Sequence, residues 1–418
     1  MAHNNRSTLA IEGGPKVRTA PWPARALFGP AERQAAIDLF DQAIATGQAF
    51  GYEGEQEAAY CRQFARTLGG GFADGVNSGT SAVYVALRAL DLEPFTEVIV
   101  PPITDPGGVM PVPLINCIPV VADAVPGSYN TGPRQVAARI TRRTSAILVA
   151  HIAGLPADMT GIMRVARARR LPVVEDCAQS HGATCKGRPV GAFGDIAAFS
   201  TMFGKHHATG GQGGLVFTKS EDLYWRARRA ADRGKPFGLP GADSNVTASL
   251  NLNLNELGAA IGRVQLKRLP RIVAARRRAA GRIARGCQSL KAVRMVTGLP
   301  GSQPTFWFLL FSLDLDRLRV DKKTFVAALA AEGLPVGASY LHVPSLARWY
   351  RQKAVFGRSR YPWACPLYKG DPDKDYPVPN ILATDACHFR MAFHENYGRR
   401  EVADIVAALK KVEAAYLR

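Results

Sequence analysis

A lysine and an aspartate follow two apolar segments that have the composition of buried strands. Lys205 comes five residues after the segment 196–200, and Asp176 ends the segment 171–176. A lysine in a crowded, partly apolar pocket loses its proton more easily and becomes a nucleophile towards carbonyls. A carboxylate at a strand end is costly unless a cation or several donors meet it, and it would stabilise a protonated ring nitrogen. Taken singly, Lys205 could equally be a solvated loop lysine, and Asp176 the cap of a turn.

A Gly–Thr–Ser turn at residues 79–81 opens the helix-like segment 81–90. The first N–H groups of a helix are unpaired and lie at the positive end of its dipole, so they can bind an anion. Thr80 and Ser81 would add hydroxyl donors, although the turn could also be a plain N-cap. Together, an anion site, a carboxylate at a strand end and a nucleophilic lysine are the groups that pyridoxal 5′-phosphate (PLP) requires.

Two further patterns near these residues bear on ligand binding. Four glycines follow the lysine: Gly210, Gly211, Gly213 and Gly214. Without side chains, they would let the backbone pass close to a bulky ligand. Three potential metal ligands are spaced four residues apart: Cys177, His181 and Cys185. This spacing would suit a metal only on a helix, and Gly182 with the following KGRPVG argues against one, so we predict no metal site.

Short apolar segments alternate with helix-like segments between residues 75 and 218. Six of the apolar segments are predicted strands: 97–102, 118–123, 145–151, 171–176, 196–200 and 214–218. Most are β-branched and apolar on both faces, as in a buried, mostly parallel sheet. The segments 81–90 and 158–170 have helical spacing. This alternation predicts an α/β domain whose ligands bind outside the carboxyl ends of the strands.

A polar loop at 236–249 and a predicted helix at 255–269 lead into a second, smaller part of the chain. We predict a large domain over residues 1–269, with an N-terminal arm over about residues 1–50, and a small C-terminal domain over 270–418. The small domain has these predicted elements: a strand at 306–315, a helix at 321–333 ending at Gly333, and an amphipathic helix at 402–417.

The composition is that of an ordinary folded protein, with 47% hydrophobic and 21% charged residues among 418. No apolar run approaches the roughly 18 residues that span a bilayer, and the start of the chain does not resemble a signal peptide. With seven cysteines, an odd number, the chain suits a reducing compartment, and we expect a cytoplasmic protein. The net charge of +19 permits an anionic partner. Nucleic acid is disfavoured because no aromatic interleaving accompanies the basic segment 271–285.

Several ordered motifs resemble those of the DegT/DnrJ/EryC1/StrS family of PLP-dependent sugar and aminocyclitol aminotransferases. They are FGYEGEQ (50–56), NSGTSAV (77–83), VEDCAQSHGA (174–183), KGRPVGAFGDIAAFS (186–200), GQGGLVFT (211–218) and LNLNLNELGAAIGRVQL (250–266). The resemblance implies fold type I, with a large domain built on a mostly parallel seven-stranded sheet and a smaller α+β C-terminal domain. It also implies a homodimer with active sites shared between subunits.

The resemblance assigns roles to individual residues. Lys205 resembles the Schiff-base lysine, Asp176 the partner of the pyridine nitrogen, and Gln179 the residue near the phenolic oxygen of PLP. The implied phosphate-binding residues are Gly79, Thr80, Ser200 and, from the other subunit, Asn251.

Three features depart from the family pattern. Asp105 in VPPITDPGG stands where the family has an aromatic residue that stacks on the pyridine ring. The spacing from Lys205 to Gly213–Gly214 is one residue longer than is common in the family. Counting forward from Ser200 therefore puts Lys205 at the Schiff-base position, whereas counting back from the two glycines puts His206 there. We favour Lys205 because a Gly-rich loop accommodates an insertion easily. Asn253 replaces an arginine that is common in the family.

The chemistry that the resemblance implies is a ping-pong transamination. Glutamate or glutamine gives its amino group to PLP, and a nucleotide-linked keto-sugar or a ketocyclitol accepts it. Candidate substrate contacts are Asp105, His206, His207, Tyr340 and His342. Two alternatives stay open: a PLP-dependent sugar dehydratase, in which some relatives carry histidine in place of the lysine, and a non-catalytic binding or regulatory protein on the same fold.

Overall fold

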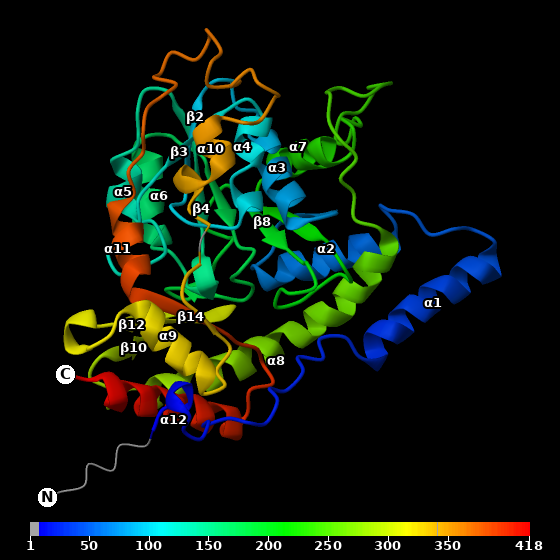
Figure 1. The fold of residues 1–418 in the computed structure, drawn as a ribbon. Coiled ribbons are helices and arrows are strands. Elements are labelled where there is room, and N and C mark those ends of the chain that lie inside the picture. Colours follow the sequence, from blue (N-terminus) through cyan, green and yellow to red (C-terminus); the bar gives the residue numbers. More distant parts are fainter. Residues whose placement is uncertain (1–7, 341) are drawn as a thin grey trace, which may run out of the picture.

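Seven strands form the central sheet of the computed structural model, which describes residues 8–340 and 342–418 (Figure 1). They are β1 (Phe72–Val76), β2 (Glu97–Val100), β3 (Ile118–Val121), β4 (Thr144–Ala150), β5 (Val173–Asp176), β8 (Ile196–Ser200) and β9 (Gly214–Thr218). Their order is β1-β9-β8-β5-β4-β2-β3. The strands from β8 to β3 are parallel, and β9 is antiparallel to both of its neighbours. The predicted α/β fold with a mostly parallel sheet is confirmed.

All six predicted strands are present, and β1 is the strand of this sheet that the sequence pattern did not predict. Asp74 and Gly75 interrupt its apolar pattern, yet both are buried. The Asp74 carboxylate lies 3.4 Å from Nε of Arg228, which offsets part of the cost of burying its charge. Pairing with β9, in which Asp74 is opposite Val216, makes this segment a strand.

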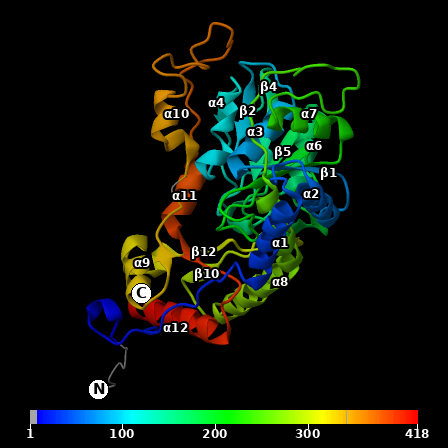
Figure 2. The same ribbon diagram turned by 90° about the vertical axis from the view of Figure 1, so that its right-hand side faces the viewer.

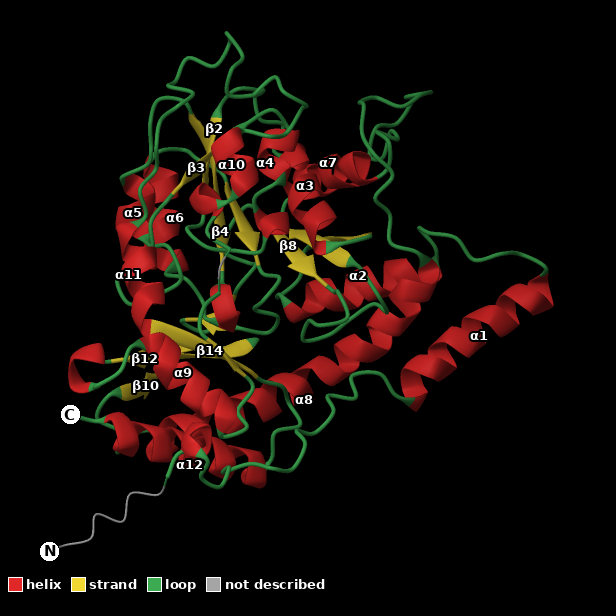
Figure 3. Cartoon of the chain, in the orientation of Figure 1, coloured by secondary structure: helices red, strands yellow, loops and turns green. Residues whose placement is uncertain are grey.

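Helices cover both faces of the sheet, because successive side chains of each buried strand point in opposite directions. On β4, Leu148 packs in the cluster that contains the apolar residues of α3 (Gly79–Ala89). Its neighbours Ile147 and Val149 pack with α6 (Met159–Ala168). Figure 3 shows the resulting layers, with strands between helices. The other helices of this part are α1 (Pro30–Thr46), α2 (Glu55–Thr67), α4 (Pro111–Leu114), α5 (Pro133–Ala137) and α7 (Glu221–Ala231).

The long helix α8 (Glu256–Gly286) joins the two parts of the chain. The helix that was predicted to end at residue 269 continues through Pro270 to Gly286. The predicted domain boundary therefore lies inside a continuous helix. Apolar side chains are buried on both sides of the proline, including Leu269 and Ile272. This continuous buried face stabilises the helix despite the missing backbone N–H of Pro270.

The C-terminal part contains a second, antiparallel sheet in the order β10-β12-β14-β13. These strands are β10 (Val293–Met295), β12 (Phe308–Leu313), β13 (Val336–Gly337) and β14 (His388–Ala392). The helices of the C-terminal part are α9 (Lys322–Ala331), α10 (Arg348–Gln352), α11 (Pro379–Cys387) and α12 (Arg399–Tyr416). A small third sheet joins β6 (Thr184–Cys185), β7 (Arg188–Pro189) and β11 (Ser302–Gln303). As predicted, α9 stops before Gly333, whose φ of 95° favours glycine.

Two segments cross between the parts of the chain. The segment that carries α10 returns to the large sheet (Figure 2), where the Tyr350 hydroxyl donates to the Pro119 carbonyl at 2.8 Å. The N-terminal arm, which was predicted to belong to the large domain, lies along the C-terminal part before α1. There Arg18 binds Asp404 at 2.6 Å, and the Trp22 ring stacks on Tyr397. None of the described helices has the length and hydropathy of a membrane span.

Candidate active site

Lys205 lies in the loop between β8 and β9, a segment closed at its base by backbone hydrogen bonds from Thr201 to Gly213 and from Thr209 to Thr201. Its side chain is buried, and the amine lies 4.0 Å from the centroid of the Trp307 ring. Within the described residues, the amine forms neither a hydrogen bond nor an ion pair. Burial lowers the pKa of this amine, and the negative charges of Asp176 and Asp105 partly oppose that shift. A larger fraction of the amine is therefore neutral and nucleophilic.

Asp176 is the last residue of β5, at the carboxyl edge of the sheet. Its Oδ1 accepts a hydrogen bond of 3.0 Å from the Ala178 N–H, while Oδ2 has no such donor in the part of the chain that the structure describes. Burial raises the pKa of this carboxyl, and the Ala178 N–H and the charge of Lys205 act in the opposite direction. The charge of Asp176 in turn opposes the lowering of the Lys205 pKa.

Glu175, which precedes Asp176 on β5, forms a buried polar group with His151. The Glu175 carboxylate accepts hydrogen bonds from the backbone N–H groups of Gly191, Phe193 and Gly194. Its Oε2 lies 3.2 Å from Nε2 of His151. The ligand atoms of His151, Glu175 and Cys177 lie within 4.8 Å of one another, all buried, as a metal site would require. The carboxylate is already occupied by protein donors, so we assign the group a structural role.

The N-terminus of α3 forms the second side of the site. Ser78 caps this helix by accepting a hydrogen bond from the Ser81 N–H at 3.0 Å. The N–H groups of Gly79 and Thr80 have no partner within the described ranges. Gly79 packs directly on Ser200, because a Cβ at Gly79 would lie 2.5 Å from the Cβ of Ser200. Two free N–H groups and a serine hydroxyl thus converge at the positive end of the helix, a suitable place for a phosphate.

Side chains from the C-terminal part complete the site. Gln179 is buried, accepts a hydrogen bond from the Ala153 N–H at 2.8 Å and donates to the Tyr340 hydroxyl at 3.0 Å. The Tyr340 ring packs edge-on against His342, with centroids 5.1 Å apart. The backbone of His342 binds the N–H of Thr104 at 3.0 Å, next to the exposed Asp105.

Comparison with known proteins agrees with this geometry. Residues 30–370 match the model of the DegT/DnrJ/EryC1/StrS aminotransferase family. The chain belongs to this family. It is 31% identical over 424 residues to L-glutamine:2-deoxy-scyllo-inosose aminotransferase of Streptomyces fradiae, covering 97% of both proteins. It is 31% identical over 340 residues to L-glutamine:scyllo-inosose aminotransferase of Streptomyces griseus, covering 78% of this chain and 79% of the relative.

A solved structure supports the same assignment. The aminotransferase from Psychrobacter cryohalolentis superposes with a TM-score of 0.79 at 27% identity, covering 95% of this chain and 99% of that one. The chain is therefore a PLP-dependent aminotransferase. The chemistry of its residues fits the cofactor, because among the described residues Asp176 keeps a carboxylate oxygen without a donor, the Lys205 amine is unbonded and the first N–H groups of α3 are unpaired.

The structure does not bring every candidate residue to this site. His206 and His207 are fully buried. Nε2 of His206 lies 3.1 Å from the Thr305 carbonyl oxygen, and Nε2 of His207 lies 2.8 Å from the Tyr60 hydroxyl. Burial holds the pKa of both imidazoles well below its usual range. Neither ring is placed to meet a substrate, and the geometry supports the count from Ser200 that selects Lys205.

Asn251 and Asp105 lie at the surface of the single chain. The side chain of Asn253, which stands in place of the common arginine, donates a hydrogen bond of 2.9 Å to the Asn251 side chain. Asp105 caps the short turn Pro106–Gly108 by accepting from the Gly107 N–H. A Cβ at Gly108 would lie 2.7 Å from Oδ2 of Asp176, so the turn that follows Asp105 packs against the Asp176 carboxylate.

Two of the glycines after the lysine, Gly213 and Gly214, lie close to other parts of the chain. A Cβ at Gly213 would lie 2.0 Å from Oγ1 of Thr209, and a Cβ at Gly214 would lie 2.4 Å from the Ser78 carbonyl oxygen. They allow close contacts within the chain, which hold the base of the lysine loop and the start of α3 together. These contacts account for the absence of a side chain at Gly213 and Gly214, and the expected close approach to a bulky ligand stays a prediction.

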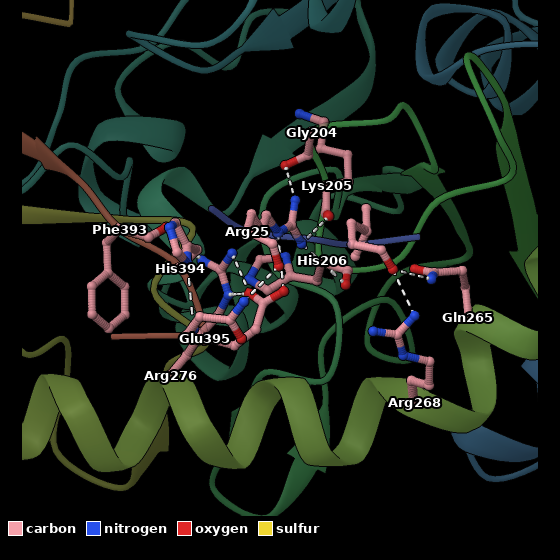
Figure 4. Close-up of polar contacts among 12 residues, drawn as sticks. Arg25, Gly204, Lys205, His206, Gln265, Arg268, Arg276, Phe393, His394 and Glu395 are labelled. Carbon is pink, nitrogen blue, oxygen red and sulfur yellow. Dashed lines mark hydrogen bonds and ion pairs between the residues drawn. The ribbon is translucent and has the colours of Figure 1, made fainter. Parts of the chain in front are cut away.

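Two residues near Lys205 were missed by sequence reasoning. Trp307, beside the amine, lies within the predicted strand 306–315, where an aromatic residue indicates only a core position. Arg25 comes from the N-terminal arm, and its guanidinium reaches the backbone of the lysine loop (Figure 4). Its distance from Lys205 in sequence, 180 residues, left no local signal.

Proposed function

We propose that this enzyme transfers an amino group from glutamine or glutamate to the carbonyl of a ketocyclitol or a keto-sugar, with Lys205 as the lysine that binds PLP. The observation that carries the proposal is the buried Lys205 amine, which lies over the Trp307 ring without a hydrogen-bond partner among the described residues. The names of the two relatives, which combine L-glutamine with inosose acceptors, support glutamine as donor and a cyclitol as acceptor.

PLP, when bound, supplies the electron sink and accepts the amino group. Lys205 would hold it through Nζ and would move a proton at the α-carbon of the amino donor, as general base and acid. The lowered pKa of this amine suits both tasks. Oδ2 of Asp176 would keep a proton on the pyridine nitrogen. Gln179, itself fixed by Tyr340, would lie at the phenolic oxygen.

The anion end of the site would hold the phosphate. Gly79 and Thr80 would donate backbone N–H groups, and Ser200 would donate its hydroxyl. Asn251 would reach the phosphate of the partner subunit, which is consistent with its exposure in the single chain.

The acceptor would bind between Asp105, Tyr340 and His342. A cavity of about 210 Å³ adjoins these residues. Its lining is Thr104, Pro106, Val109, His342, Val343, Pro344, Leu346, Ala347 and Trp349. No arginine or lysine is among them, whereas a diphosphate group would call for cations. The cavity therefore favours an uncharged ketocyclitol. The Asp105 carboxylate would accept hydrogen bonds from its hydroxyl groups.

A half-reaction assay tests this function. We expect L-glutamine or L-glutamate, mixed with the PLP-loaded enzyme, to remove the visible absorption band of the lysine-bound cofactor, and scyllo-inosose to restore it. A nucleoside-diphosphate-linked keto-sugar, tested in parallel, distinguishes the two acceptor classes. If no amino acid donor discharges the band, transamination is ruled out and another PLP reaction must be sought.

We also propose that the enzyme is a homodimer with shared active sites. α1 projects from the body of the molecule (Figure 1) and exposes Ile37, Phe40 and Ile44 on one face. The opposite contact of this helix is made by Leu39 and Glu32, which are buried. A contiguous exposed apolar face on a projecting helix is unusual for a monomer and fits an interface between two copies.

Charged substitutions on this face test the dimer. We expect Phe40→Glu combined with Ile44→Glu to shift the protein from twice the chain mass to 45.0 kDa in light scattering, because each buries a charge in the interface. The control is Ala31→Glu with Gln42→Glu, which adds the same charge at exposed positions on another face of α1. A wild-type protein that sediments as a monomer would refute the proposal.

A further inference from the structure

The backbone around Lys205 is held by side chains from distant parts of the chain. The Arg25 guanidinium donates from Nη1 to the Gly204 carbonyl at 3.1 Å and from Nη2 to the Lys205 carbonyl at 2.6 Å. Nε1 of Trp307 donates to the same Gly204 carbonyl at 3.1 Å. Figure 4 shows Arg25 directed at the Gly204 and Lys205 carbonyls from the arm side. The loop that carries the reactive amine thus depends on two groups outside the large sheet.

Arg25 is itself fixed by the C-terminal part of the chain. Its Nε binds Oε1 of Glu395 at 3.0 Å, and its own carbonyl accepts from the Asn396 side chain at 2.7 Å. The charges of Arg276 and Arg25 outweigh the effect of burial and lower the pKa of the Glu395 carboxyl, so it stays ionised. A planar guanidinium held by a carboxylate can present two N–H groups in a defined direction, which an ammonium group cannot.

Arg276 links this group to Trp307. It is buried in α8, where it binds Oε2 of Glu395 at 2.9 Å and the Phe306 carbonyl at 2.8 Å. Nη1 of Arg276 also lies 3.3 Å from the Trp307 carbonyl. Trp307 therefore has a fixed backbone, an indole N–H on the Gly204 carbonyl and a ring face beneath the Lys205 amine. The Lys205 carbonyl is therefore hydrogen-bonded by this network, and the Lys205 amine lies 4.0 Å from the ring centroid of one of its members, Trp307.

We propose that Arg25 is a positioning residue of the aminotransferase: anchored by Glu395, it holds the Gly204–Lys205 backbone so that the amine keeps a defined place over Trp307 and towards Asp176. This inference rests on the proposed role of Lys205. The fork of Arg25 acts on carbonyl groups, so its effect on the reaction is through the lysine and not through contact with substrate. Small displacements of a reacting group are costly, about 100-fold in rate for about 1 Å.

Arg25→Lys and Arg25→Gln test this role. Lysine keeps the charge that Glu395 requires, but it cannot donate to two carbonyls and a carboxylate in one plane. We expect Arg25→Lys to melt close to the wild-type temperature, and its single-turnover rate with L-glutamine to fall about 10- to 100-fold. Donor half-saturation should change little, because all three guanidinium nitrogens of Arg25 already donate to protein oxygens. Arg25→Gln should show a larger loss and a shifted pH titration of the visible band.

A readout without cofactor separates positioning from catalysis. In the PLP-free protein, hydrogen exchange of the amides of residues 203–209 should be faster in both variants, because the loop loses its external anchor. Arg358→Gln is the control, since Arg358 is exposed and forms no hydrogen bond or ion pair within the described residues. Wild-type rate, band titration and loop exchange in Arg25→Lys would overturn the inference. A wild-type enzyme that no donor discharges would instead refute the proposed function, while the exchange experiment would still decide the anchoring role.

Discussion

Replacing Lys205 with alanine is expected to lower the rate of the half-reaction with L-glutamine by roughly 10²–10⁴-fold, the range for loss of a general acid–base group. The variant should also lose the visible band of the lysine-bound cofactor, because the nucleophile that forms the bond is absent. The fold should persist, since the Lys205 amine makes no hydrogen bond among the described residues and removing it leaves no buried partner unpaired.

The measurement combines stopped-flow absorbance with borohydride reduction and peptide mass mapping. In the wild-type enzyme, the reduced cofactor should be found on the peptide that contains Lys205. Lys219→Ala is the matched control, since Lys219 is exposed just after β9. Label on another lysine, or an unchanged rate in Lys205→Ala, would show that the reactive amine lies elsewhere.

The second large effect is expected for Asp176→Asn. Asparagine keeps the shape and can still accept the Ala178 N–H, but it cannot hold a protonated pyridine nitrogen by charge. Losing a preorganised electrostatic contact of this kind costs about 10²–10³-fold in turnover, by analogy with the removal of one oxyanion-hole donor. The affinity for PLP should weaken, and single-turnover kinetics with equilibrium cofactor binding measure both effects.

The sign of the accompanying stability change distinguishes a site residue from a structural one. Burial raises the pKa of Asp176 in the cofactor-free chain, so its ionised form is disfavoured by folding. The stability linked to this group is present at low pH and is lost as the pH rises through its folded pKa. We therefore expect cofactor-free Asp176→Asn to be as stable as the wild type, or more stable, at neutral pH. Asp222→Asn, at an exposed carboxylate, is the control.

Two outcomes would contradict this role for Asp176. One is a cofactor-free variant that melts well below the wild type, which would make the carboxylate a structural group. The other is unchanged turnover in a variant that still binds PLP. In the wild type, PLP affinity should fall as the pH decreases through the pKa of Asp176, because the protonated carboxyl loses its charge, and this dependence should vanish in Asp176→Asn.

Local patterns were sufficient for six of the seven strands of the large sheet and predicted the two central groups. The apolar segments that became β2 to β5 and β8 bury side chains on both faces, so their composition identified them as strands. Parallel strands place their carboxyl ends at one edge, and for this reason Asp176, at the end of β5, and Lys205, in the loop after β8, could be expected to meet. The turn at Gly79 was predicted from its Gly–Thr–Ser residues at the start of a helix-like segment, and α3 begins there.

The sequence pattern was misleading where contacts between distant residues decide the structure. Asp74 and Gly75 interrupt the apolar pattern of β1, so the sequence did not predict this strand. Its formation depends on pairing with β9. His206 and His207 were attractive substrate contacts by their proximity to Lys205, yet the loop turns both rings into the interior towards Thr305 and Tyr60. Proximity along the chain within a loop does not determine the direction of a side chain.

The residue types and their order along the chain indicated the aminotransferase family and the cofactor, which the comparisons confirm, and predicted the lysine–aspartate pair, because all three depend on segments that are local in sequence. The anchoring of the lysine loop was decided by tertiary structure. The sequence separation between Arg25 and Glu395 is 370 residues, and Trp307 lies between them. Their polar groups meet only when the arm, the start of β12 and the segment after β14 pack together. Such long-range contacts carry no periodic signal, since each residue is specified by partners that lie on other elements.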